Sequence, residues 1–303
     1  MSVMEVYRYH AFGMQIESSF PLGGYLPGVG AADVIVREGS VPVTFPGPPG
    51  ENSFVVERPG SFAYRIKEIA SYLIQDGREV IVEKDERSVD HAFSSFFSGT
   101  CIGALLLQRG KLPIHGSALL IDGKGIIVTG QSGAGKSTVT ASLNKLGYEF
   151  LADDIAALEL EDTEGATIYP GFPIQRLWRD TATRIFGGVE TFERIPGIRD
   201  KFNIPIPPEQ FVTSNRKLHA LFELLPADCA AVEVEELRGA EKITRVINNT
   251  YWYDLVNVMG LREWHFAQCA RIANQIRVFR VRRPLHGFTT DEQIRGMLEA
   301  LHK

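Results

Sequence analysis

The stretch that decides the fold reads Gly130-Gln131-Ser132-Gly133-Ala134-Gly135-Lys136-Ser137. It matches the pattern G-x-x-x-x-G-K-[ST], whose glycines let several backbone N–H groups converge on one phosphate group. The flanking sequence supplies the context that this pattern requires. A β-branched run at 125–129 predicts a buried strand, and apolar residues at helical spacing over 137–146 predict a helix. Strand, glycine loop and helix in this order indicate nucleotide binding rather than a flexible surface loop.

The pattern also assigns chemistry to single side chains. We expect Lys136 to reach the β- and γ-phosphates of ATP, and the hydroxyl of Ser137 to ligate Mg²⁺. The residues predicted to bind the nucleotide are Gly130, Gln131, Ser132, Gly133, Ala134, Gly135, Lys136, Ser137 and Thr138.

An acidic pair follows the next predicted strand, at 148–152. Asp153 and Asp154 stand at its C-terminal end, the side on which α/β sheets bind ligands. One carboxylate can hold a metal ion while the other accepts the proton of an attacking hydroxyl. The alternative is that the pair forms a turn or caps the next element. The chain has no L-S-G-G-Q segment and no complete N-K-x-D motif, which favours phosphoryl transfer to an acceptor over a transporter ATPase or a GTPase.

The residues from His115 to Asp154 resemble the catalytic core of HPr kinase/phosphorylase. Three segments carry the resemblance: I-H-G-S-A-L-L-I at 114–121, G-I-I-V-T-G-Q-S-G-A-G-K-S at 125–137 and G-Y-E-F-L-A-D-D at 147–154. Members of that family phosphorylate a serine of a small carrier protein. The resemblance implies a mixed α/β fold with a P-loop kinase core of the HPr kinase/PEP carboxykinase type.

The resemblance also assigns roles residue by residue. Lys136 and Ser137 match the family's phosphate and Mg²⁺ residues. Asp153 matches the base that acts on the serine hydroxyl, and Asp154 matches its acidic neighbour near the metal. His115 matches a histidine beside the active site, although a histidine between apolar neighbours is also typical of a protein core.

Two departures put HPr itself in doubt as the substrate. The late V-R-P-G-R-N segment that is linked to phosphorolysis is missing; residues 280–287 read R-V-R-R-P-L-H-G instead. The N-terminal part does not resemble the family's regulatory domain. The segment Y-H-A-F-G at 9–13 and the His-Gly-Ser segment are more similar to kinases found with lasso-peptide biosynthesis, which phosphorylate the C-terminal serine of a precursor peptide.

The favoured interpretation is therefore an ATP- and Mg²⁺-dependent kinase of a peptide serine. Kinases of an HPr-like protein or of a small molecule, such as a free amino acid or sugar, stay open, and so does a nucleotide-binding regulator without turnover. The resemblance does not fix the oligomeric state, so a homo-oligomer stays open too.

Composition argues against several other classes of protein. Hydrophobic residues make up 44% of 303 and the net charge is −5, which fits a globular protein and disfavours a general nucleic-acid binder. The chain has three cysteines, Cys101, Cys229 and Cys269, an odd number whose spacing matches no metal site. Cys101 and Cys269 lie in apolar stretches, which predicts that their thiols are buried. Polar residues interrupt the longest apolar stretch, Phe93–Leu107, and no signal peptide precedes it, so we expect a cytoplasmic protein without a membrane span.

Along the chain, residues 1–90 are expected to form a β-rich N-terminal module and 91–303 the catalytic domain. Strands are predicted at 7–10, 33–37, 54–57, 62–66 and 79–83. The module either extends the kinase core as a non-catalytic sheet or provides a docking surface for a peptide or partner. An aromatic stripe at helical spacing predicts a buried connecting helix over 92–108.

The remaining predictions concern the second half of the chain. Residues 175–201 are rich in arginine, which suits either phosphate recognition or a solvated helical face, and Arg176 is the best catalytic candidate among them. Residues 203–210 are proline-rich and predict a mobile loop that closes over substrate. Residues 250–273 have a helical pattern.

Overall fold

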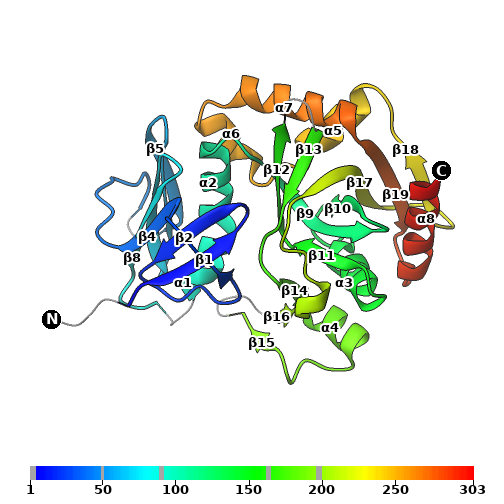
Figure 1. Cartoon of the computed structure of the whole chain (residues 1–303), viewed down its shortest axis with the longest axis horizontal. Helices are drawn as coiled ribbons and strands as arrows, with labels where there is room; N and C mark the ends of the chain where they lie inside the picture. Colours follow the sequence, from blue (N-terminus) through cyan, green and yellow to red (C-terminus); the bar gives the residue numbers. More distant parts are fainter. Residues whose placement is uncertain (1–4, 49–50, 89–91, 162–164, 196–199) are drawn as a thin grey trace. The chain divides into compact units, whose positions relative to one another are not determined.

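The chain forms two compact units (Figure 1). A computed structural model describes residues 5–48, 51–88, 92–161, 165–195 and 200–303. The first unit comprises Met1–Lys111 with Ile195–Arg199 and Asp254–Arg262. The second comprises Leu112–Arg194, Asp200–Tyr253 and Glu263–Lys303. The predicted division near residue 90 stays a prediction.

The first unit is built on an eight-stranded sheet with the order β3-β1-β2-β4-β8-β7-β6-β5. All five strands predicted from alternating patterns are present. Neighbouring strands are antiparallel except in the β2–β4 and β4–β8 pairs, which are parallel. The strands are β1 (Tyr7–Ala11), β2 (Met14–Ser18), β3 (Leu26–Pro27), β4 (Val34–Glu38), β5 (Ser53–Arg58), β6 (Ser61–Ile66), β7 (Ala70–Gln75) and β8 (Glu79–Lys84).

One helical segment covers one face of this sheet, as the aromatic stripe predicts. It consists of α1 (Ala92–Phe96), a π-helical turn at Phe97–Cys101 and α2 (Ile102–Gln108). The buried hydroxyls of Tyr64 and Tyr72, on adjacent strands, donate hydrogen bonds to the carbonyls of Phe96 (3.1 Å) and Phe93 (3.0 Å). These bonds satisfy both tyrosine hydroxyls inside an otherwise apolar interface.

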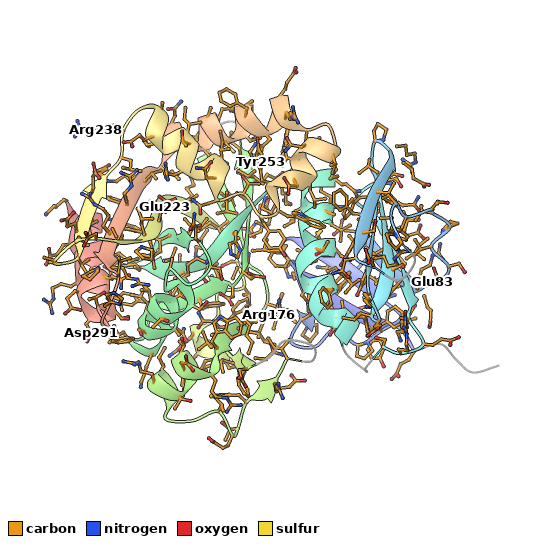
Figure 2. All side chains as sticks on the ribbon, turned by 180° about the vertical axis from the view of Figure 1, so that it is seen from behind. Glu83, Arg176, Glu223, Arg238, Tyr253 and Asp291 are labelled. Carbon is orange, nitrogen blue, oxygen red and sulfur yellow. The ribbon has the colours of Figure 1, made fainter. Side chains whose placement is uncertain are left out.

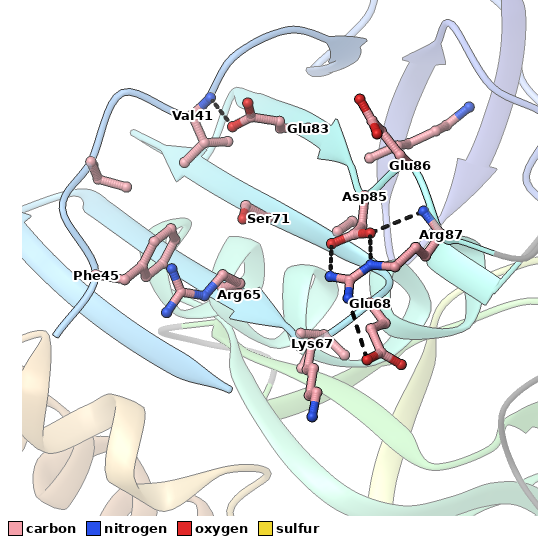
Figure 3. A pocket seen from close by; sticks show the side chains of 14 residues that line it. Val41, Phe45, Arg65, Lys67, Glu68, Ser71, Glu83, Asp85, Glu86 and Arg87 are labelled. Atoms are coloured by element: carbon pink, nitrogen blue, oxygen red, sulfur yellow. Dashed lines mark hydrogen bonds and ion pairs between the residues drawn. The ribbon is translucent and has the colours of Figure 1, made fainter. Parts of the chain in front are cut away.

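The opposite face of the same sheet carries a second, smaller apolar cluster with a pocket beside it. Successive residues of a strand point to opposite faces, so Ala63 and Leu73, next to the tyrosines, pack with Val41 on this side. The pocket has a volume of about 600 Å³ (Figure 3). Charged side chains of both signs line it, and Arg87 pairs there with Asp85.

The second unit is built on a mixed sheet with the order β10-β9-β12-β13-β17-β19-β18, in which β10 also pairs with β17 and β11 with β9. The predicted strands at 125–129 and 148–152 are both present. The strands are β9 (Leu112–Ile121), β10 (Lys124–Gly130), β11 (Glu149–Ala152), β12 (Ile155–Glu161), β13 (Gly165–Tyr169), β17 (Arg216–Ala227), β18 (Glu233–Glu236) and β19 (Arg277–Pro284).

Helices pack on this sheet and complete a mixed α/β fold, as predicted. The helices α5 (Ala240–Asn248) and α7 (Arg262–Gln275) contribute Val246 and Ile272 to a core shared with Ile127 of β10 (Figure 1). Ile126 and Val128, which alternate with Ile127, point to the other face. There, α3 (Lys136–Lys145) packs against β9 and β10, and α8 (Thr290–His302) packs against α3, β18 and β19.

A small third sheet corrects the prediction of a loop over residues 203–210. Its order is β14-β16-β15, with β14 (Ile174–Trp178), β15 (Glu193–Arg194) and β16 (Lys201–Pro205). The start of the proline-rich segment 203–210 is thus a paired strand, followed by a 3₁₀ turn at Pro208–Gln210, and not one long loop. Pro205 is tolerated because it ends the strand.

The other helical predictions hold in part. The segment 250–273 contains two helices, α6 (Tyr253–Val258) and α7, because Gly260 adopts a left-handed φ of 70° and ends the first. Cys101 and Cys269 are buried, as predicted. Within the described parts of the chain, no helix is both long and apolar enough to cross a membrane.

Candidate active site

The phosphate loop joins β10 to α3 in the predicted way. β10 lies between an antiparallel neighbour, β9, and a parallel one, β17. At Gly130 a Cβ atom would lie 2.5 Å from the carbonyl oxygen of Leu224 on β17, so the strand can pack this closely only without a side chain. Gly135 has a φ of 102° and precedes the first residue of α3. The loop therefore ends in a helix N-terminus, where orphan N–H groups favour an anion.

Lys136 is the first residue of α3, and its side chain folds back over the loop. Its Nζ donates hydrogen bonds to the carbonyls of Gly130 (2.7 Å) and Gln131 (3.2 Å). Partial burial lowers the pKa of Lys136, while the nearby carboxylates of Asp154 and Asp153 act in the opposite direction. The ammonium group is thus held against the first two residues of the loop, close to Asp153 and Asp154.

Asp153 is held by two hydrogen bonds at the end of β11. Its Oδ1 accepts a bond of 2.6 Å from the hydroxyl of Ser117, and its Oδ2 accepts one of 2.8 Å from the backbone N–H of Arg176. Burial raises the pKa of the Asp153 carboxyl, and the two hydrogen bonds only partly oppose this. A carboxylate whose pKa is raised toward neutrality and whose position is fixed is suited to act as a general base.

Asp154 forms the tight turn between β11 and β12. The N–H of Ile155 donates to the carbonyl of Asp153 (2.7 Å), and Asp154 between them has a φ of 65°. Asp tolerates this left-handed conformation better than most residues, and strained backbone of this kind gathers at functional sites. The turn directs Asp154 Oδ1 to within 3.4 Å of Nδ1 of His115.

His115 lies on β9 and belongs to the same cluster. Its Nδ1 is 3.1 Å from the carbonyl oxygen of Asp154, and its side chain is about one-third exposed rather than buried in the core. The structure therefore brings His115, Asp153, Asp154 and Lys136 together. Their roles in catalysis stay predictions.

Arg176 lies on β14, so the alternative of a solvated helical face is wrong at this position. Among the described residues of the segment 175–201, the helix is α4 (Arg179–Phe186). Its side chain is 13% exposed, and one guanidinium nitrogen lies 3.9 Å from Oδ2 of Asp154. Its buried Nε has no hydrogen-bond partner among the described residues. The guanidinium therefore places a positive charge beside the acidic pair, a group suited to phosphate recognition.

Magnesium has a fitting set of donors at this site. Asp154 supplies carboxylate oxygens and Ser137, half-buried at the start of α3, supplies a hydroxyl. Mg²⁺ usually takes one or two carboxylates and completes its shell with waters and substrate phosphates. Among the described residues, no group of three or more His, Cys, Asp or Glu side chains is placed to hold a metal ion.

Three further residues lie at the loop or beside it, and sequence reasoning missed them as site residues. Arg283 of β19 donates to the carbonyls of Ala134 (3.0 Å) and Gly133 (3.2 Å). Gln175, 1% exposed, donates to Oγ1 of Thr140 on α3 (2.7 Å). Lys201 of β16 lies close enough to influence both Asp153 and Lys136 electrostatically. These contacts come from strands distant in sequence, and no local motif marks them.

A buried polar network supports the strand that leads into the loop. Oγ1 of Thr129 lies 2.7 Å from both Oδ1 of Asn249 and the carbonyl oxygen of His115. Nδ2 of Asn249 donates to the carboxylate of Glu223 on β17 (3.2 Å), which Arg245 also approaches. Figure 2 shows Glu223 and Arg176 on the same unit. This network fixes β9, β10 and β17 relative to one another beside the loop.

Comparison with known proteins gives a partial match. No protein-family model matches this chain. Over 60 residues the chain is 41% identical to HPr kinase/phosphorylase of Bacillus mycoides (strain KBAB4), Bacillus cereus (strain B4264) and Bacillus anthracis (strain A0248). The match covers 18% of this chain and spans only 19% of the length of these curated relatives. Over this segment the chain is similar to HPr kinase/phosphorylase.

A solved structure is also similar. The Hpr(Ser) kinase/phosphatase from Coxiella burnetii aligns with 63% of this chain and 89% of its own, at 15% sequence identity and a TM-score of 0.32. A superposition this loose places no individual residue.

Proposed function

We propose that this protein transfers the γ-phosphate of ATP to a serine hydroxyl of a peptide, in a reaction that depends on Mg²⁺. The observation that carries the proposal is the position of Asp153. Its buried carboxylate is fixed by Ser117 and the Arg176 backbone and lies within electrostatic reach of Lys136. A kinase needs a base at this place, beside the phosphate loop, because the acceptor hydroxyl must lose its proton as it attacks.

In the proposed reaction the N–H groups of 130–137 and Lys136 hold the β- and γ-phosphates. Asp153 accepts the proton of the serine hydroxyl while the new bond from the serine oxygen to phosphorus forms and the bond to the β-phosphate oxygen breaks, which releases ADP. Lys136 and Arg176 offset the negative charge on the transferred group. Asp154 and Ser137 would hold Mg²⁺, which when bound supplies further positive charge to the phosphates.

The favoured acceptor is the C-terminal serine of a lasso precursor peptide, and the proposed place of action is the cytoplasm, where ATP is available. The second candidate is a kinase of an HPr-like protein, which the 60-residue match to HPr kinase/phosphorylase favours. A regulator without turnover would not need Lys136, Asp153 and Asp154 gathered at one loop, so we place it last.

Acceptor-dependent consumption of ATP tests the proposal. Purified protein with ATP and Mg²⁺ should form ADP only slowly, and a peptide that ends in serine should accelerate ADP formation. Nucleotide binding without any acceptor-dependent turnover, across serine peptides, HPr and small molecules, would contradict the proposal and favour the regulator.

A further inference from the structure

A pocket of about 350 Å³ lies against the first residues of the phosphate loop. Its wall is formed by Gly130 and Gln131 of the loop, His115 of β9 and the segment 248–252, which begins with the last residue of α5. This volume is near the lower limit of about 300–1,000 Å³ for small-molecule sites, so the pocket suits one side chain rather than a whole nucleotide.

The pocket lies at the end of the loop where the transferred phosphate is expected. In this motif the backbone N–H groups surround the inner phosphates and the lysine reaches the β- and γ-phosphates. Here Nζ of Lys136 contacts the carbonyls of Gly130 and Gln131, the same two loop residues that border the pocket. A group bound in the pocket would therefore lie beside the acceptor.

The wall opposite the loop is rigid. The N–H of His115 donates to the carbonyl of Asn249 (2.7 Å), and the N–H of Tyr251 donates to the carbonyl of Pro113 (2.8 Å). These two backbone bonds pair the segment with β9 in an isolated antiparallel β-bridge between Ile114 and Thr250. The hydroxyl of Thr250 lies 2.7 Å from Nε2 of the buried His265 on α7, which anchors the segment from behind.

The strongest sign of function is the backbone of Trp252. Its φ is 48°, in a region that bulky residues rarely adopt. Such strain persists where the surrounding structure enforces it, and it gathers at ligand sites. Trp252 and Tyr251 give the pocket two aromatic side chains, and the ring of Tyr251 lies 5.9 Å from that of His115.

The lining also indicates what the pocket would bind. No Asp, Glu, Lys or Arg belongs to it among the described residues, and the polar residues that line it are Gln131, Asn248, Asn249, Thr250 and His115. A charged side chain entering it would lose water without meeting an opposite charge, apart from a protonated His115. An uncharged aromatic ring would pack against Trp252 and Tyr251.

We infer that this pocket binds an uncharged aromatic side chain of the peptide residue next to the acceptor serine, which for a C-terminal serine is the residue before it. The inference rests on the proposed function, because it requires a peptide acceptor. It makes Trp252 and Tyr251 determinants of peptide specificity, with no part in nucleotide binding.

The test uses four synthetic peptides that end in serine and differ only in the preceding residue: Phe, Ala, Glu or Lys. Burial of one aromatic ring predicts a kcat/KM for the Phe peptide roughly tenfold or more above that for the Ala peptide. The Glu and Lys peptides should be poorer still. The variant Trp252→Asn should lose the preference for Phe and keep the KM for ATP, because Asn tolerates a left-handed φ.

The control is Phe266→Asn, which removes another aromatic ring, 59% exposed, outside the pocket. It should leave the peptide preference unchanged, and thermal unfolding should show that both variants are folded. If Trp252→Asn fails to fold, Tyr251→Ala serves as the second pocket variant.

The outcomes separate this inference from the proposed function. Loss of the Phe preference in the pocket variant alone supports the inference. Equal phosphorylation of all four peptides, a preference for Glu or Lys, or a Phe preference that survives Trp252→Asn overturns it and leaves the peptide kinase in place. Phosphorylation of none of the peptides, with ATP still bound, overturns both.

Discussion

Ser117 on β9 and Asp153 at the end of β11 are joined by a hydrogen bond of 2.6 Å between Oγ and Oδ1. The two residues lie on neighbouring antiparallel strands, and the bond stabilises the charged form of a carboxylate whose pKa burial raises. The bond opposes the effect of burial, so we expect it to extend to lower pH the range in which Asp153 can act as a base.

Replacement of Ser117 by Ala should shift the acidic limb of the pH–rate profile to higher pH. Loss of the donated hydrogen bond removes an interaction that lowers the pKa of Asp153, so that pKa rises further and the carboxylate is protonated at pH values where the wild type is active. At high pH the two proteins should differ little. Profiles of kcat/KM from about pH 5 to 9 measure the shift. Ser117→Thr, which keeps the hydroxyl, is the control, and an unmoved limb in Ser117→Ala would count against Asp153 as the base.

Asp153→Asn should abolish phosphoryl transfer and leave the protein at least as stable as the wild type. The activity loss should reach about 10²–10⁴-fold, the usual contribution of a general base, with ATP affinity retained. The amide can keep both hydrogen bonds, because its oxygen accepts from the Arg176 N–H and its NH₂ donates to the Ser117 hydroxyl.

The sign of the stability effect follows from the raised pKa. The folded protein binds more protons than the unfolded chain between the ordinary pKa of Asp and the raised one, so the free energy of unfolding falls as the pH rises through that interval. Asp153→Asn removes this pH-dependent contribution to the free energy of unfolding. Urea unfolding at pH 5 and pH 7 checks it: a smaller drop between the two pH values is expected in the variant, and a large loss of stability at pH 7 would contradict the burial argument.

Arg283→Ala should raise the KM for ATP by about tenfold, on the order of one charge-assisted hydrogen bond. The guanidinium holds the carbonyls of Gly133 and Ala134, and without it the loop loses the contact that fixes its backbone. Because Arg283 acts through the loop, kcat at saturating ATP should change less than KM. Arg282→Ala is a matched control on the same strand, since Arg282 forms an exposed ion pair with Glu233. Equal effects of the two variants would show that Arg283 has no special role.

Asn249→Ala should lower the free energy of unfolding by about 1–3 kcal/mol, the typical cost of leaving buried polar groups unsatisfied. The change removes partners from the Thr129 hydroxyl and from the Glu223 carboxylate, which is 8% exposed. The neighbouring Asn248 is exposed, so Asn248→Ala should be nearly neutral in the same denaturant titration. A neutral Asn249→Ala would show that the network adds nothing to stability.

The sequence predicted the parts of the site that are local in the chain. The phosphate loop, its strand and its helix follow from one motif, and the place of Asp153 and Asp154 follows from the strand before them. Apolar and β-branched runs also located five strands of the first unit and, in the second, the strands at 125–129 and 148–152. In each case the signal lies within about ten residues, where backbone geometry and periodicity decide the structure.

What sequence reasoning missed depends on pairing between distant segments. The proline-rich sequence at 203–210 predicts a loop. In the structure Lys201–Pro205 is a strand because it pairs with β14. Arg283 stands out in the sequence only within the segment 280–287, which differs from V-R-P-G-R-N. Its contact with the loop requires β19 to align beside β17. The helical pattern of 250–273 does not reveal the break at Gly260 or the left-handed φ of Trp252.

The most direct test of the central claim is intact-mass analysis of possible acceptors. Purified protein, ATP and Mg²⁺ are mixed in parallel with a peptide that ends in serine, with HPr and with free serine, and Asp153→Asn is run beside the wild type. The account predicts a mass gain of one phosphate on the serine peptide with the wild type and none with Asp153→Asn. A gain on HPr or free serine alone, or an equal gain with Asp153→Asn, would contradict it.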